Sequence, residues 1–291
     1  MAATVACIAG EEIYRQWDAG RIEGERLGTR QTPFGKSQEV FLVSGETPFY
    51  LLPRYGVGLG KTAPRKINDL ANMYALKDLG AKHVLAWGPC GAVTHNIAVG
   101  DLVIPDDVID YTYLRHKTYF EDSPLGFLRQ FPVFCPSLRR IVGDVLADMK
   151  LVYHGSGTIA VSEGPRLETP AEVRMLASIG AETVTHTFVP EVFLAKELQM
   201  CYAAVTYVVN YAETGSRHRP FAAGELFGGL NQASDSQRLT SAVAAMSRIV
   251  TAVSAAAAQK PDLGCDCDKT MAHHIRQYNL PADWRKWFHL S

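Results

Sequence analysis

The chain has 291 residues, of which 47% are hydrophobic and 20% charged, and its formal net charge is −1. These values are typical of a soluble globular protein with a sizeable core, and they exclude a basic surface field that would hold a nucleic acid. No run of about 18 apolar residues predicts a membrane-spanning helix. The start MAATVACIAGEE is too short for a signal peptide and lacks its basic flank, so we expect a cytoplasmic protein with no membrane partner.

Short apolar or β-branched runs predict buried strands along most of the chain. They lie at residues 4–10, 39–45, 49–56, 83–93, 101–110, 157–165 and 201–211.

Segments with helical periodicity lie between these strands, at residues 66–81, 169–181, 190–200 and 236–259. The second begins with Thr169 as N-cap and Pro170 in its first turn, and it stops at Gly180. Strands that alternate with helices predict one α/β domain, with a mixed, largely parallel twisted sheet flanked by helices. We expect this domain to span residues 1–262 and residues 263–291 to form a C-terminal appendage that packs on it.

The cysteines divide into two groups. Cys265 and Cys267 lie in the appendage, ahead of His273 and His274. Zinc sites usually have two to four residues between paired cysteines, so Cys-x-Cys is a poor match and we predict no metal site. We expect instead a tail that packs its aromatic residues on the body, namely Trp284, Trp287 and Phe288. The other four lie in or beside apolar runs, as buried reduced thiols do, and are Cys7, Cys90, Cys135 and Cys201.

Loops at the ends of predicted strands are the expected place for a ligand. In open α/β sheets, ligands bind beyond the carboxyl ends of the strands. Five such loops are rich in glycine or polar residues, at residues 9–12, 54–60, 87–91, 163–169 and 210–215. The residues that follow the last loop, Arg217, His218 and Arg219, are interpreted as a surface loop.

A family resemblance rests on four stretches that occur in this order: WGPCGAVTHNIAVGDLVIPDDVID, GTIAVSEGPRLETPAEVRMLASIGAETV, VPEVFLAKE and YVVNYAE. They resemble the trimeric purine nucleoside phosphorylase and methylthioadenosine phosphorylase family, from about Ala2 to about Gln259. TPFGK and NDLANMYALKDLGAKHV are most similar to the methylthioadenosine branch.

The resemblance implies a nucleoside phosphorylase-like fold, a homotrimer and a pentosyltransferase activity. Such an enzyme cleaves the N-glycosidic bond of a purine nucleoside with phosphate as co-substrate and no other cofactor. The products are the free purine and ribose 1-phosphate or 5-methylthioribose 1-phosphate. Which 5′ substituent is accepted stays open.

For the base, the resemblance implies that Glu168 and Asn210 are the catalytic positions. Glu168 would accept a hydrogen bond from purine N1–H, and Asn210 would support O6 and N7. A carboxylate facing N1 favours a 6-oxopurine, because hypoxanthine and guanine carry a proton there and adenine does not. The other implied substrate-binding residues are Pro89, Cys90, Gly91, His186 and Tyr211. His186 stands where the family has a ribose-binding Met, and it either bonds a ribose hydroxyl or is a satisfied core histidine.

The nucleophile end departs from the family pattern. The family's glycine-rich loop, its RHG motif and its hydroxyl-bearing turn read here CIAGEE, RYG and WGPCG. The implied phosphate or nucleophile positions are Gly10, Glu11, Arg54, Tyr55, Gly88 and Thr187. Arg54 and Thr187 keep the family's residue types, whereas Glu11 replaces a hydroxyl. A carboxylate beside a phosphate dianion is repulsive by on the order of several kcal/mol.

Three functions follow from this departure. In the first, Glu11 turns outward or pairs with Arg54, and phosphate still binds. In the second, Glu11 is a general base that activates water, because CIAGEEIY is similar to the opening of the methylthioadenosine/adenosylhomocysteine nucleosidases. In the third, the protein binds nucleosides or another flat ligand without turnover.

Overall fold

The computed structural model describes residues 3–20, 22–57, 62–212, 233–260 and 262–289. In these ranges the strands are β1 (Val5–Ala9), β2 (Gly24–Thr32), β3 (Gly35–Val43), β4 (Phe49–Pro53), β5 (His83–Ala92), β6 (Leu102–Val103), β7 (Asp107–Tyr111), β8 (Tyr153–His154), β9 (Thr158–Ser162), β10 (Thr183–Thr185) and β11 (Cys201–Tyr211). The α-helices are α1 (Glu11–Asp18), α2 (Asp69–Asp78), α3 (Pro136–Asp148), α4 (Pro170–Ser178), α5 (Glu191–Glu197), α6 (Ala233–Ala258) and α7 (Ala272–Tyr278).

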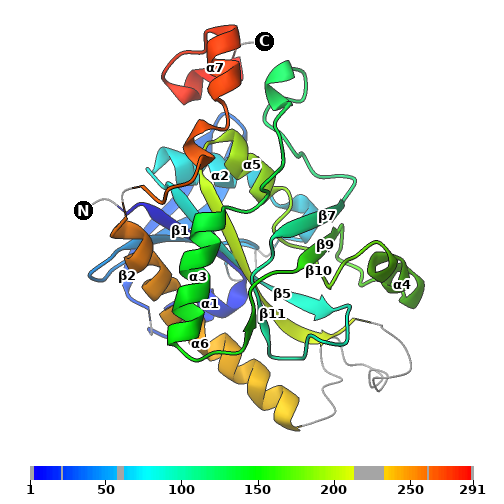
Figure 1. Ribbon diagram of the computed structural model, residues 1–291. Coiled ribbons are helices and arrows are strands. Elements are labelled where there is room, and N and C mark those ends of the chain that lie inside the picture. The colour runs from blue at the N-terminus through cyan, green and yellow to red at the C-terminus, as the bar shows by residue number, and fades with distance from the viewer. Residues whose placement is uncertain (1–2, 21, 58–61, 213–232, 261, 290–291) are drawn as a thin grey trace.

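These strands form one mixed sheet in the order β2-β3-β4-β1-β5-β10-β9-β7, with β11 also paired to β5 (Figure 1). Its centre is parallel, because β1 runs parallel to β4 and β5, and β11 runs parallel to β5. The β2–β3–β4 edge is antiparallel, as are the β10–β5 and β11–β6 pairs. The predicted fold class, a mixed and largely parallel sheet flanked by helices, is confirmed.

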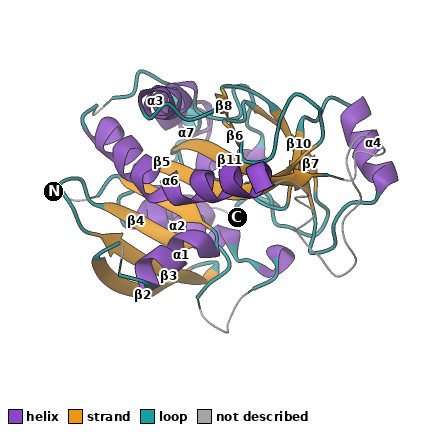
Figure 2. Cartoon of the chain, turned by 90° about the horizontal axis from the view of Figure 1, so that it is seen from below, coloured by secondary structure: helices purple, strands orange, loops and turns teal. Residues whose placement is uncertain are grey.

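Two large apolar clusters cover the faces of the sheet. One contains Met73 of α2 and Leu194 of α5, and the other contains Val142 of α3 and Ile249 of α6. Helix α4 stands apart from them, at the edge beyond β7 and β10 (Figure 2). The helices on both faces leave the loop ends of the strands open to a ligand.

Helix α6 is apolar enough, over Ser234–Ala258, to cross a membrane by length and composition alone. One of its faces is buried, through Ala245, Met246, Ile249 and Val253, in the cluster that it shares with α3 and β11. This arrangement is that of a core helix in a globular protein.

Several elements differ from the sequence-based expectation. The strand expected at 101–110 is wrong as a single element, since β6 pairs with β11 and β8 whereas β7 pairs with β9. Strand β2 and helices α1 and α3 were not expected. Helix α5 begins at Glu191, with Pro190 as its N-cap.

The last described segment, residues 262–289, packs on the body beside α2 and α5 (Figure 1). Trp284 lies 4.8 Å from Tyr74 of α2, and Phe288 lies 5.2 Å from Phe34, measured between ring centroids. The Thr270 hydroxyl donates a hydrogen bond to the Lys196 carbonyl oxygen at the end of α5 (2.6 Å). These contacts pack the segment on the body, whereas the boundary near residue 262 stays a prediction.

Candidate active site

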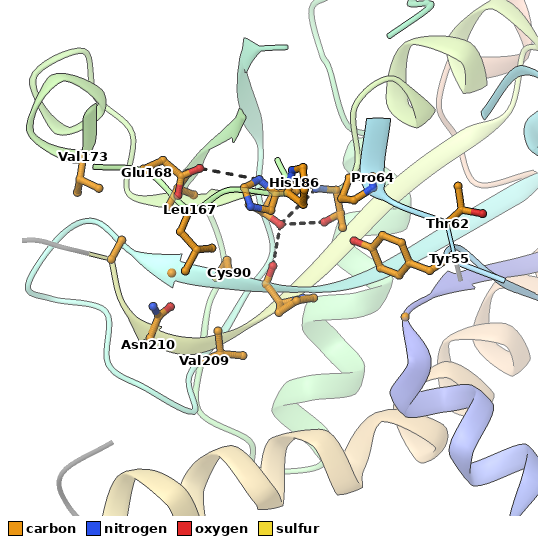
Figure 3. A pocket seen from close by; sticks show the side chains of 18 of the residues that line it. Tyr55, Thr62, Pro64, Cys90, Leu167, Glu168, Val173, His186, Val209 and Asn210 are labelled. Atoms are coloured by element: carbon orange, nitrogen blue, oxygen red, sulfur yellow. Dashed lines mark hydrogen bonds and ion pairs between the residues drawn. The ribbon is translucent and has the colours of Figure 1, made fainter. Parts of the chain in front are cut away.

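A cavity of about 390 Å³ lies at the ends of β1, β4, β5, β10 and β11 (Figure 3). All five loops singled out in the sequence contribute described residues to it. Its lining residues are Gly10, Tyr55, Gly56, Thr62, Pro64, Pro89, Cys90, Gly91, Pro165, Leu167, Glu168, Val173, Val184, Thr185, His186, Thr187, Val209, Asn210 and Ala212. This volume is within the range of small-molecule sites.

At one end of the cavity, Glu168 and Asn210 lie on different walls (Figure 3). The Ser162 hydroxyl donates a hydrogen bond to one oxygen of the Glu168 carboxylate. Helix α4 begins directly after Glu168 with a reciprocal capping box, in which Thr169 and Glu172 bond each other's backbone N–H groups. The Glu168 carboxylate is therefore held in place by the Ser162 hydroxyl and by the capped N-terminus of α4, which follows it in the chain.

The position of the Asn210 amide depends on the close approach of β5 and β11. The pairing of β11 with β5 shifts register between Val208 and Asn210, so the amide sits at an irregularity in the strand. A Cβ at Gly91 would come within 3.0 Å of Asn210 Oδ1 and of the Ala212 side chain. A side chain at Gly91 would therefore require Asn210 and Ala212 to move by a few tenths of an ångström.

His186 stands between this end and the middle of the cavity (Figure 3). Its Nδ1 lies 2.8 Å from Ser162 Oγ and 3.8 Å from Glu168 Oε1. Burial lowers the pKa of His186, while the Glu168 charge acts in the opposite sense, so the ring is neutral at pH 7. Because Ser162 occupies Nδ1, Nε2 is the ring nitrogen that a ligand can meet.

The other end of the cavity contains the start of helix α1 and several hydroxyl groups. Gly10 is the N-cap of α1 and lines the cavity, so the N-terminal N–H groups of the helix are close to it. Thr187 Oγ1 lies 3.0 Å from Thr185 Oγ1, which donates to the Pro89 carbonyl oxygen (2.7 Å). Among the described lining residues none carries a cationic side chain. An anion here would be held by dipoles and hydroxyl groups.

Arg54 lies beneath this end and not in it. Its side chain is 2% exposed, and its guanidinium bonds both oxygens of the Glu191 carboxylate and the Trp87 carbonyl oxygen. Burial alone would lower the pKa of Arg54, but the charge and hydrogen bonds of Glu191 outweigh it and raise that pKa. The Arg54 charge is thus cancelled inside the protein.

Comparisons with known proteins agree with this geometry. Residues 29–255 match the family model described as "Phosphorylase superfamily". The chain belongs to the phosphorylase superfamily.

Two curated relatives are named as phosphorylases. A probable 6-oxopurine nucleoside phosphorylase of Thermococcus kodakarensis is 36% identical over 72% of this chain and 79% of its own length. A probable S-methyl-5′-thioinosine phosphorylase of Methanothermobacter thermautotrophicus is 37% identical over 72% of this chain and 71% of its own length. A methylthioadenosine phosphorylase from an Antarctic soil metagenomic library shares the fold, with a TM-score of 0.82 and 22% identity over 100% and 99% of the two chains. The family inferred from the sequence motifs is confirmed.

The structure brings most of the predicted site residues of this phosphorylase superfamily member together. Those that line the cavity are Gly10, Tyr55, Pro89, Cys90, Gly91, Glu168, His186, Thr187 and Asn210. Arg54, Gly88 and Tyr211 are not lining residues. A Cβ at Gly88 would come within 2.8 Å of Thr187 Oγ1, so any other residue there would require a shift of the Thr187 side chain. Glu11 is the first residue of α1, and its side chain lies outside the described residues, as do residues 213–232 with Arg217, His218 and Arg219.

Two residues that organise the site were not predicted. Ser162 lies in the GTIAVSEGPRLET stretch and contacts both Glu168 and His186 through its hydroxyl group. Arg115 donates hydrogen bonds to the carbonyl oxygens of Ser162, Glu163, His186 and Val189 at 2.5–3.1 Å. Arg115 therefore ties together the loop before Glu168 and the loop that carries His186.

Proposed function

We propose that the protein is a purine nucleoside phosphorylase of the methylthioadenosine/methylthioinosine type. It transfers the pentosyl group of the nucleoside to phosphate, with release of the free purine and formation of ribose 1-phosphate or 5-methylthioribose 1-phosphate. The observation that carries this proposal is the meeting of Glu168 and Asn210 at one end of a cavity whose other end contains a helix N-terminus and Thr187. The names of the curated relatives support the same activity.

The proposed mechanism assigns each end of the cavity one part of the reaction. Glu168 accepts the N1–H of a 6-oxopurine, and Asn210 stabilises the negative charge that the leaving purine gains at N7 and O6. His186 faces the sugar between them. Phosphate lies at the start of α1, near the Thr187 hydroxyl, and attacks C1′ as the glycosidic bond breaks.

The anion end supports a second candidate, a nucleosidase. Arg54 is bound to Glu191, and the described lining residues provide no cation for phosphate. Glu11 is the first residue of α1 at the same end, and the similarity of CIAGEEIY to the opening of the nucleosidases implies that it is the base that activates water.

The decisive experiment incubates the protein with inosine and with 5′-methylthioinosine, each with and without phosphate, and identifies the sugar product. A phosphorylase forms the sugar 1-phosphate only when phosphate is present. Free sugar formed at the same rate without phosphate would contradict the proposal and establish the nucleosidase. Ligand binding without any product would reject both activities.

The base assignment is tested with Glu168→Gln. The neutral amide has one acceptor oxygen where the carboxylate has two, and Ser162 and purine N1–H must compete for it, so we expect kcat/KM for inosine to fall by about 10- to 100-fold. The kcat/KM for adenosine should change less, so the ratio of kcat/KM for inosine to that for adenosine should fall. Glu39→Gln, on the β2–β3 hairpin outside the cavity lining, is the matched control and should leave both values unchanged.

We also propose that the enzyme is cytoplasmic and works as a homotrimer. Large apolar side chains are exposed in one stretch of the described chain, at Tyr113, Leu114, Phe127 and Phe131, and an interface between subunits would cover them.

A further inference from the structure

Four cysteines from three separate parts of the chain meet at the apolar cluster that α3 and α6 share. Cys135 precedes α3, Cys201 begins β11, and Cys265 and Cys267 lie in the appendage. Their Sγ atoms all lie within 4.8 Å of one another, and the Cys201 and Cys265 sulfurs are 3.4 Å apart. All six cysteines of the protein are free thiols in this structure.

The spacing of the four sulfurs fits a tetrahedral metal site. With Zn–S bonds of about 2.3 Å, the edges of a tetrahedron of thiolates are about 3.8 Å long. A Cys-x-Cys pair alone is a poor zinc motif, and the sequence offered only two neighbouring histidines as further ligands. The fold instead brings Cys135 and Cys201 to the pair, while His274 stacks on Tyr278 of α7. Distant cysteines therefore complete a ligand set of four.

The two body cysteines are held before any metal arrives. The Cys135 N–H donates a hydrogen bond to the Tyr202 carbonyl oxygen (2.8 Å), which fixes the start of α3 against the start of β11. Cys135 is the N-cap of α3, and its sulfur accepts a hydrogen bond from the Leu138 N–H (3.4 Å). Backbone donors to sulfur and a helix N-terminus both favour a thiolate at this position.

A pair of disulfides fits this arrangement less well. Each of the four sulfurs is close to the other three, whereas disulfides would join them two by two at about 2.05 Å and push the pairs apart. A bond between Cys265 and Cys267 would also close a very small ring. In addition, Cys135 and Cys201 are buried and Cys265 and Cys267 are half-buried, as the ligands of a closed structural site are.

We propose that Cys135, Cys201, Cys265 and Cys267 bind one zinc ion that fastens the appendage to the body of the protein. On binding, the thiols release their protons to solvent and coordinate as thiolates, without any change of oxidation state. The ion would fix residues 262–289 at their first turn, a short distance before the Thr270 hydrogen bond to Lys196. This replaces the sequence-based prediction of no metal site, and it does not depend on the proposed function.

The test measures metal bound to the full chain. After purification in a reducing buffer, loading with Zn²⁺ and removal of loose metal, elemental analysis should find about one zinc per chain. The Cys265→Ser/Cys267→Ser double variant should lose at least about nine tenths of it, because two ligands are gone. Cys7→Ala is the control, since Cys7 is a buried free thiol in β1 outside the cluster, and it should keep the full amount.

A second measurement tests the geometry of the site and its effect on stability. Wild-type protein loaded with Co²⁺ should show the intense visible bands of tetrahedral cobalt and a sulfur-to-cobalt charge-transfer band. Chelation should lower the melting temperature of the wild type by several degrees and leave the double variant unchanged.

Three results would overturn the proposal: a wild type that binds far less than one zinc per chain after loading, a double variant that keeps the metal, or an octahedral cobalt spectrum. Loss of two hydrogens per cysteine pair in the intact mass, in protein free of metal under reducing conditions, would assign the cluster to disulfides instead.

Discussion

Arg115 does not line the cavity, but its hydrogen bonds hold two of the loops that form the candidate site. Its side chain is 5% exposed, and its donors meet carbonyl oxygens from two loops that are distant in sequence. A planar guanidinium can serve several carbonyl groups at once, which an ammonium cannot do with the same geometry.

Arg115→Lys should therefore lower kcat/KM for phosphorolysis by about 10- to 100-fold, since hydrogen bonds to a charged group are lost behind both Glu168 and His186. Steady-state kinetics with inosine measures the effect. Arg139 also donates to backbone carbonyls, of Ile104 and Gly155, but outside the cavity lining, so Arg139→Lys should stay within about twofold of wild type. Equal losses in the two variants would remove the special role of Arg115.

Glu197, the last residue of α5, makes stability depend on pH. Burial raises the pKa of its carboxyl to about 7, although the Thr118 hydroxyl and the Tyr119 N–H donate to it. An acid whose folded pKa is raised stabilises the protein below its unfolded value, near 4.5, and loses that stabilisation as the pH rises through 7.

We expect the free energy of unfolding to fall by about 2–3 kcal/mol between pH 5 and pH 8 through this group. In Glu197→Gln, which cannot ionise, this part of the slope should vanish even if stability at pH 5 is lower. Urea unfolding of both proteins at several pH values provides the comparison. Parallel pH profiles would show that Glu197 does not titrate in this range.

Glu168, Asn210 and Gly91 could be predicted from the sequence, because each lies in a motif whose residue order is specific to the family. The roles of Arg115 and Ser162 could not be predicted, for a physical reason. Their partners are backbone carbonyls and side chains brought together from distant segments, and no nearby pattern of residues encodes such contacts.

Among the elements, α4 shows how a local signal positions a functional residue. Thr169 Oγ1 accepts from the Glu172 N–H (3.3 Å), and the Glu172 carboxylate accepts from the Thr169 N–H (2.7 Å). This capping box fixes the residue after Glu168 and directs Val173 into the cavity.

Thr169→Ala should lower the stability of α4 by about 1 kcal/mol through loss of the cap. Faster amide hydrogen exchange in α4 and a lower denaturant midpoint would show it. The control is Ser178→Ala at the other end of the helix, where the hydroxyl donates only to the Met175 carbonyl oxygen, and it should change little. If both variants behave alike, the capping box does not stabilise the helix.

Helices and strands with a regular spacing of apolar residues could be predicted from the sequence, and those without such a spacing could not. Strand β2 reads GERLGTRQT and is largely exposed, so it lacks the apolar run of a buried strand. Strand β10 has three residues, too few for any period to be visible. Strands β6 and β7 share one apolar stretch of sequence but join different partners, which is decided by the sheet as a whole.

At the scale of the whole molecule, the proposed trimer would cover the exposed apolar side chains between Tyr113 and Phe131. We expect light scattering to give about three times the chain mass of 31.9 kDa. Phe127→Ser/Phe131→Ser should shift the protein toward smaller species. A monomeric wild type would contradict the proposed trimer.

The internal pairing of Arg54 with Glu191 has a consequence for how the enzyme meets its anionic co-substrate. A free cation at the mouth of a site attracts an anion from roughly a Debye length away, whereas helix N–H groups and hydroxyls act only over a few ångströms. Among the described residues at this end of the cavity, none offers a free cation that would draw an anion from a distance, so the shape of the pocket would select the anion more than its charge. Added salt should consequently have little effect on the capture of phosphate.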